Sequence, residues 1–133
     1  MANEGSGALA TEIDKNGEKT YYASNSESLS GYSIAVLTDK ETSCCGELFA
    51  CDLRDFGMAA IIGETTKGNA DVHEAFSLSD GSGVVLTVAK VYPYITETFD
   101  GVGIKPDVKI SSDKNTDEND AQLQKAIEYL SKK

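Results

Sequence analysis

Two adjacent thiols lie where the chain is predicted to turn from a strand into a helix. Cys44 and Cys45 follow an apolar run at residues 34–37 and open an amphipathic segment. A sharp turn of this kind exposes the side chain at the bend beside the free N–H groups of the helix start. A helix N-terminus lowers the pKa of a thiol from its ordinary value of about 8.5. The spacing therefore predicts a nucleophile elbow with Cys44 at the bend.

The candidate proton acceptor for this thiol is His73, the single histidine of the chain. An imidazole within about 3 Å of the sulfur could take its proton. The alternative is that His73 is a structural or solvent-facing side chain and that Cys44 is only a small residue filling a helix start. Lys67 is a further candidate for a basic group, because a one-residue bulge would bring it back toward the elbow.

Apolar spacing and turn residues predict an α/β fold, a βαβ unit with a mixed sheet, β-hairpins and a C-terminal helix. The expected elements are hairpins over 8–13 with 19–23 and 70–78 with 84–91, strands at 32–38, 59–63 and 108–110, and helices at 45–56 and 120–130, the last with Asp120 as its N-cap. Strand, helix and strand in succession imply parallel pairing. Strand 32–38 is predicted to be buried on both faces, because its apolar residues run without alternation.

Length and charge limit the possible functions. The chain has 133 residues, a formal net charge of −10 and only 12 basic residues, which argues against binding to nucleic acid or anionic membranes. From its apolar runs and its polar first residues we expect neither a transmembrane segment nor a signal peptide. Three nearby cysteines predict neither a disulfide framework nor a zinc site, and Cys51 is expected to pack in the core.

Several short segments along the chain, taken in order, resemble the sequences of one protein family. The matching segments are 34–39, 42–47, 53–57, 62–66, 78–83, 86–90 and 101–107. Over residues 32–130 the chain is similar to the C-terminal processing (tail-specific) serine peptidases. The resemblance divides the chain into an N-terminal hairpin and linker (1–31), a peptidase-like core (32–110), a polar linker (111–119) and a C-terminal helix (120–133).

The resemblance implies a crotonase-like core that hydrolyses peptide bonds with a Ser–Lys dyad and a supporting Gln, without a metal or an organic cofactor. The position of the nucleophilic Ser is Cys44 here, that of the Lys is Asn69, and that of the Gln is His73. The N–H of Cys45 corresponds to an oxyanion donor. The resemblance also implies an extracytoplasmic location and peptide or protein C-termini as ligands. Because this sequence matches only the C-terminal part of the core, the resemblance further implies the rest of a longer parent peptidase as partner.

Three functions are compatible with these substitutions. In the first, Cys44 attacks the scissile carbonyl, His73 carries the proton, and Asn69 orients His73 or a water molecule. In the second, the module is catalytically degenerate and binds peptides or a partner protein. In the third, the chain is a half-domain whose exposed sheet face or edge associates with a partner or with itself.

Overall fold

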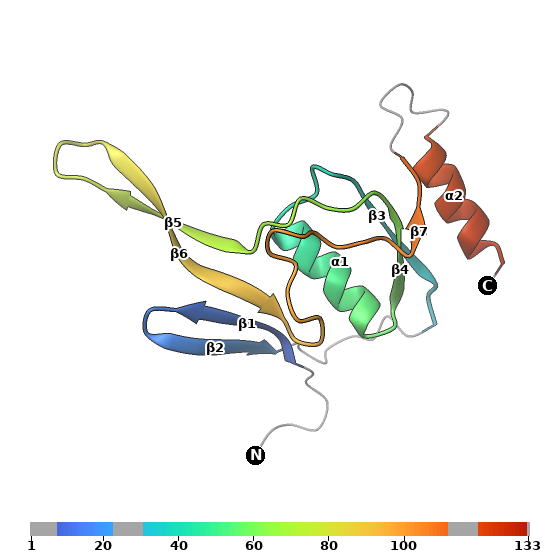
Figure 1. Cartoon of the computed structure of the whole chain (residues 1–133), viewed down its shortest axis with the longest axis horizontal. Helices are drawn as coiled ribbons and strands as arrows, with labels where there is room; N and C mark the ends of the chain where they lie inside the picture. Colours follow the sequence, from blue (N-terminus) through green and yellow to red (C-terminus); the bar gives the residue numbers. More distant parts are fainter. Residues whose placement is uncertain (1–7, 23–30, 112–119, 133) are drawn as a thin grey trace, which may run out of the picture.

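The computed structural model describes residues 8–22, 31–111 and 120–132, which form two sheets and two helices (Figure 1). The larger sheet has the order β2-β1-β6-β5 and the smaller one the order β3-β4-β7. The strands are β1 (Ala8–Asp14), β2 (Gly17–Tyr22), β3 (Ile34–Thr38), β4 (Ala59–Gly63), β5 (Asp71–Ser77), β6 (Gly83–Pro93) and β7 (Val108–Lys109), and the helices are α1 (Cys45–Asp55) and α2 (Ala121–Leu130). None of the helices in these described ranges has the length and apolar character needed to cross a bilayer.

The predicted βαβ unit is confirmed. Strands β3 and β4 run parallel, with Val36 opposite Ile61, and α1 connects them. Helix α1 packs against β4, and its Ala50 and Cys51 join Ile61 in a fully buried cluster. The remaining buried members of this cluster are Ala70, Phe99 and Ile104. The expected burial of Cys51 is therefore confirmed.

The prediction that strand 32–38 is buried on both faces is wrong. Strand β3 is an edge strand of the smaller sheet, and Leu37 is 38% exposed. A continuous apolar run indicates two covered faces only inside a sheet, whereas an edge strand of a three-stranded sheet has fewer neighbours to cover it. The predicted N-cap of the last helix is confirmed, since Asp120 accepts hydrogen bonds from the N–H groups of Gln122 and Leu123 at 2.9 and 3.2 Å.

Both predicted hairpins are present, and they share one sheet because β1 pairs with β6. The boundary at residue 31 stays a prediction. The expected polar linker at 111–119 lies almost wholly outside the described residues.

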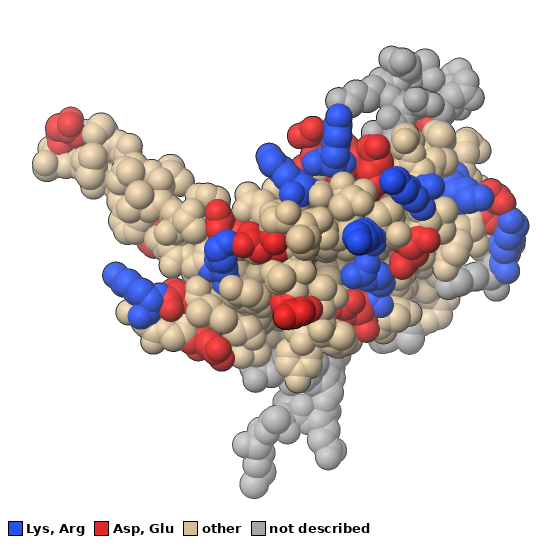
Figure 2. All heavy atoms as spheres, in the orientation of Figure 1, with Lys and Arg blue, Asp and Glu red and all other residues tan. Residues whose placement is uncertain are grey.

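The hairpin formed by β5 and the first half of β6, here called the hairpin arm (residues 71–89), projects away from the rest of the molecule (Figure 1). Strand β5 is the edge strand of the larger sheet. The arm exposes four large apolar side chains, Phe76, Leu78, Val85 and Leu86. On the visible face it carries few charged atoms apart from an acidic group near its tip (Figure 2).

The loop at residues 101–107 lies directly on the segment that leads into β5. Gly103 has a φ of 69°, and a Cβ added there would lie 2.1 Å from the carbonyl oxygen of Thr66. Next to it, the Ile104 N–H donates to Thr66 Oγ1 at 2.7 Å, and the Thr66 N–H donates to the Ile104 carbonyl at 3.2 Å. Only glycine permits this approach of two backbones.

Replacing Gly103 by Ala should therefore destabilise the chain by about 2–5 kcal/mol, the sum of positive-φ strain and overpacking. Gly101 provides a matched control, because its φ of 71° is similar but nothing lies within 4 Å of an added Cβ. Gly101→Ala should cost only the strain, about 1–2 kcal/mol. Urea unfolding measures both variants, and equal losses would contradict the close approach at Gly103.

Candidate functional site

Cys44 sits at the N-cap of α1 in a strained backbone conformation. Its φ is 53° and its ψ is −116°. Among the described residues it is the only non-glycine residue with a positive φ. Such outliers persist only where the surrounding structure holds them, and they gather at active sites and ligand-binding sites. The turn predicted between strand and helix is thus present, with Cys44 at the bend.

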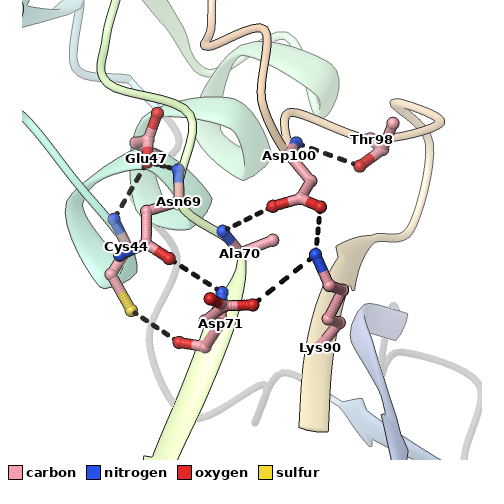
Figure 3. Close-up of polar contacts among 8 residues, drawn as sticks. All are labelled: Cys44, Glu47, Asn69, Ala70, Asp71, Lys90, Thr98 and Asp100. Carbon is pink, nitrogen blue, oxygen red and sulfur yellow. Dashed lines mark hydrogen bonds and ion pairs between the residues drawn. The ribbon is translucent and has the colours of Figure 1, made fainter. Parts of the chain in front are cut away.

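The elbow is fixed by the side chain of Glu47, which is 0% exposed. Its carboxylate accepts hydrogen bonds from the N–H groups of Cys44 at 3.0 Å, Gly68 at 2.6 Å and Asn69 at 2.8 Å. It also accepts one from the hydroxyl of Thr66. These four donors come from both sides of the site, so Glu47 joins the start of α1 to the segment before β5 (Figure 3).

The Cys44 thiol points toward the start of β5, where its Sγ lies 3.8 Å from the carbonyl oxygen of Asp71 (Figure 3). Burial raises the pKa of the Cys44 thiol, and the neighbouring Cys45 thiol and the Glu47 charge raise it further. A backbone hydrogen bond from Cys45 acts in the opposite direction without reversing the shift. The expectation that the helix N-terminus lowers this pKa is therefore wrong, because desolvation and nearby acidic groups outweigh the helix start.

Of the other predicted site residues, Asn69 lies at the site, whereas His73 and Lys67 are exposed. Asn69 lies at the site, but its side-chain Oδ1 accepts a hydrogen bond from the Asp71 N–H at 3.0 Å and so holds the first residue of β5. His73 is exposed on β5, and no hydrogen bond to Cys44 is found for it within the described ranges. Lys67 is also exposed, and its backbone N–H donates to the Thr42 carbonyl at 2.9 Å. The structure thus gathers Cys44, Cys45 and Asn69, while in the described part of the chain neither His73 nor Lys67 forms a hydrogen bond with the thiol.

A charged group beside the site was missed from the sequence. Lys90 on β6 forms an ion pair with Asp100 and approaches Asp71 Oδ1 at 3.5 Å (Figure 3). Asp100 in turn accepts from the Ala70 N–H at 3.5 Å. The hydrogen bond to Asp100 raises the pKa of Lys90, so this ammonium stays charged and is no proton acceptor. The signal available in the sequence was the hairpin register, which places Lys90 opposite Asp71.

The chemistry available here is that of a thiol on a strained turn with a backbone N–H, that of Cys45, directed at it. No group of three or more His, Cys, Asp or Glu side chains that could hold a metal ion occurs in the part of the chain that the structure describes. A nucleophile with an adjacent N–H donor is the arrangement used in acyl transfer.

Comparisons with known proteins bear on the family and the fold of this chain. Residues 2–110 match the model of peptidase family S41. A carboxyl-terminal-processing protease of Synechocystis sp. is 30% identical over 123 residues, covering 89% of this chain and 29% of that protein. The chloroplastic carboxyl-terminal-processing peptidase 2 of Arabidopsis thaliana is 39% identical over 74 residues, covering 56% and 14%.

Among solved structures, a photosystem II D1 C-terminal processing protease matches with a TM-score of 0.71 and 30% identity, covering 80% of this chain and 28% of that one. The chain therefore has the α/β architecture of such protease cores. It spans less than a third of the length of the carboxyl-terminal-processing proteases named above, 29% of the Synechocystis protein.

Replacing Glu47 by Gln should destabilise the chain by about 3 kcal/mol. The amide has one acceptor oxygen in place of two and directs an NH₂ group at N–H donors, which leaves buried donors unpaired. Urea unfolding measures the loss, and hydrogen exchange at the Gly68 and Asn69 amides should accelerate in parallel. The matched control is Glu74→Gln on the exposed part of β5, expected within about 0.5 kcal/mol of the unaltered chain. Equal stability of the two variants would show that Glu47 does not hold the elbow.

Proposed function

This chain belongs to peptidase family S41, and from that membership we propose that it is the nucleophile-bearing part of a C-terminal-processing peptidase core with Cys44 as nucleophile. The observation that carries the proposal is the backbone strain at Cys44, with φ 53° and ψ −116°. A residue that only filled a helix start would have no need of this conformation, whereas a nucleophile elbow depends on it.

In the proposed reaction the Cys44 sulfur attacks the scissile carbonyl carbon, and the thiol proton passes to His73. The Cys45 N–H stabilises the oxyanion. His73 then protonates the leaving amine, and water hydrolyses the resulting thioester to regenerate the thiol. A second oxyanion donor would come from the rest of a longer peptidase chain, and the lack of one donor costs about 10²–10³ in rate.

The role of His73 is supported by its place on β5. The sulfur lies against the carbonyl of Asp71, and His73 follows two residues later, so its Cα lies about 6–7 Å further along the strand. The strand is irregular between Val72 and His73, where the pairing register with β6 shifts. Bulges redirect side chains near active sites. Asn69 would serve by holding the first residue of β5 in place.

The second candidate function is a catalytically degenerate module that binds peptides or a partner protein. Two observations favour it. The pKa of the Cys44 thiol is raised, so the sulfur is protonated near neutral pH, and the exposed His73 makes no recorded contact with it in the described ranges.

The ligands, location and partners proposed for this chain follow from the family. Proteins similar to it are named for carboxyl-terminal processing, which supports peptide or protein C-termini as substrates or ligands. An extracytoplasmic location rests on the family alone.

The proposed partner is the rest of a longer peptidase chain, packed against the hairpin arm. The exposed Phe76, Val85 and Leu86 of the arm, at 39%, 63% and 49%, form apolar surface on a projecting element. Its outer strand β5 pairs with β6 on one side and has no further neighbour among the described strands. An exposed apolar strand at a sheet edge is a site for pairing with another chain. Without that partner, the arm supports self-association.

An activated ester of a short peptide tests the catalytic proposal by leaving an acyl group on the nucleophile, detected by intact-protein mass spectrometry. The unaltered chain and Cys51→Ala should be acylated, and Cys44→Ala should not. Because the pKa of the Cys44 thiol is raised, its acylation rate should still be rising with pH above about 8.5, where an ordinary thiol levels off.

The same experiment separates the two functions. If His73 acts as base, His73→Ala should lower the acylation rate at neutral pH by about 10²-fold or more, while the neighbouring Glu74→Ala should not. Two outcomes would contradict Cys44 as the nucleophile and favour the binding function: no acylation of Cys44 at any pH, or an acyl adduct that still forms in Cys44→Ala.

Sedimentation velocity over a range of concentrations tests the hairpin arm. The unaltered chain should self-associate increasingly with concentration, and Phe76→Ser combined with Leu86→Ser should shift it to monomer. Val102→Ser is the matched control, since Val102 is 64% exposed on the loop outside the arm. A monomer at every concentration, or an effect of Val102→Ser equal to that of the arm variant, would count against the arm as an association surface.

A further inference from the structure

The sulfur atoms of Cys44 and Cys45 lie 4.0 Å apart at the start of α1. We propose that this vicinal dithiol, Cys44 with Cys45, is a binding site for a thiophilic divalent cation of the Zn²⁺ or Cd²⁺ kind. Two thiols on adjacent residues seldom present their sulfurs side by side without a turn to aim them. Here the strained backbone of Cys44 provides that turn.

The separation of the sulfurs fits a bridging ion. Zinc–thiolate bonds are about 2.3 Å long, so two sulfurs 4.0 Å apart are bridged with an S–Zn–S angle of about 120°. This value is close to the tetrahedral angle that zinc prefers and far from a linear arrangement. A cation can therefore bind both sulfurs without a change in the backbone. Thiolates are also the ligands that select soft cations over magnesium and calcium.

The two sulfurs are the protein ligands of this proposed site, because the neighbouring polar side chains are engaged in other contacts. The Glu47 carboxylate already accepts four hydrogen bonds, and Asn69 Oδ1 is bonded to the Asp71 N–H. The third thiol, that of Cys51, is 0% exposed and contacts Asp55 Oδ2. Cys45 is exposed and Cys44 is half-buried, so the two sulfurs are reached from solvent. These features describe an exchangeable site, not a structural one with four protein ligands.

The charge balance of binding gives a measurable signature. The thiolate, not the thiol, is the ligand of a metal ion, so each of the two thiols gives up its proton when the cation binds. The reaction is one divalent cation plus two thiols giving a neutral dithiolate complex and two released protons. Binding should therefore strengthen as pH rises. The chain's net charge of −10 favours the approach of cations in general, so the two thiolates must be distinguished from acidic side chains.

The consequence for function is that cation binding occupies the sulfur of Cys44. This consequence rests on the proposed catalytic role, in which the same sulfur is the nucleophile. If Cys44 has that role, the bound cation inhibits the reaction reversibly. The binding itself is independent of that role. The two proposals can therefore fail separately. The chain can bind the cation even if Cys44 does not react with the activated ester, and Cys44 can react with the ester even if the chain does not bind the cation.

The experiment is a titration of the full chain with CdCl₂, followed by thiolate-to-cadmium charge-transfer absorption in the ultraviolet and by proton release in weakly buffered solution. One cation should bind and two protons should leave. Cys45→Ser should weaken binding about a hundredfold, the share of one thiolate in the affinity of structural zinc sites. Cys51→Ala, which removes the buried thiol, should bind as the unaltered chain does.

A second measurement on the unaltered chain does not depend on any variant's folding. Saturation with Cd²⁺ should protect Cys44 and Cys45 from alkylation together, as mapped by peptide mass spectrometry. Undiminished affinity in Cys45→Ser, release of fewer than two protons, binding without charge-transfer absorption, or protection of one thiol alone would each overturn the proposal.

Discussion

The buried carboxylate of Glu47 is the interaction on which the rest of the site depends. A buried carboxylate is costly unless its lone pairs are satisfied, and here four donors satisfy it. Those donors belong to the start of α1 and to residues 66–69, which are far apart in the sequence. Satisfying one side chain therefore forces the elbow and the entry to β5 into contact. This requirement sets the distance between Cys44 and β5, and the contact between thiol and strand, from Cys44 Sγ to the Asp71 carbonyl oxygen, is long at 3.8 Å.

The strain at Cys44 can persist because the elbow is held on more than one side. Before the bend, the Asp39 side chain accepts from the Thr42 N–H at 2.9 Å, and the Thr42 carbonyl accepts from the Lys67 N–H at 2.9 Å. After it, Glu47 binds the Cys44 N–H. The segment at residues 66–69, whose N–H groups donate to Thr42 and Glu47, is itself covered by the loop that carries Gly103. An unfavourable backbone conformation of this kind costs about 1–3 kcal/mol, which several satisfied hydrogen bonds offset.

Local pattern predicted the elements well and the relations between them less well. The βαβ unit, both hairpins and the Asp120 cap follow from apolar spacing and turn residues within short stretches of sequence, so they can be predicted without knowledge of the rest of the fold. The edge position of β3 depends on how many strands its sheet has, which no feature of residues 32–38 encodes. No pattern in the sequence sets Glu47 apart from an ordinary acidic residue in the first turn of a helix, because its partners Thr66, Gly68 and Asn69 are identified only when the chain is folded. The ion pair between Lys90 and Asp71 follows from the hairpin register, which places the two residues opposite each other.

The same carboxylate explains why the elbow thiol is not activated by its helix. A helix N-terminus stabilises a thiolate through its free N–H groups and a partial positive charge of about half a unit. At this helix start, Glu47 takes the Cys44 N–H and adds a negative charge near the sulfur, while burial and Cys45 act in the same direction. The interaction that builds the elbow thus removes much of the field that would ionise its thiol. Stability and reactivity compete for one helix start, and near neutral pH the thiol keeps its proton unless another group takes it. A base from β5, a base from a partner chain and a thiophilic cation are three ways to meet that single requirement.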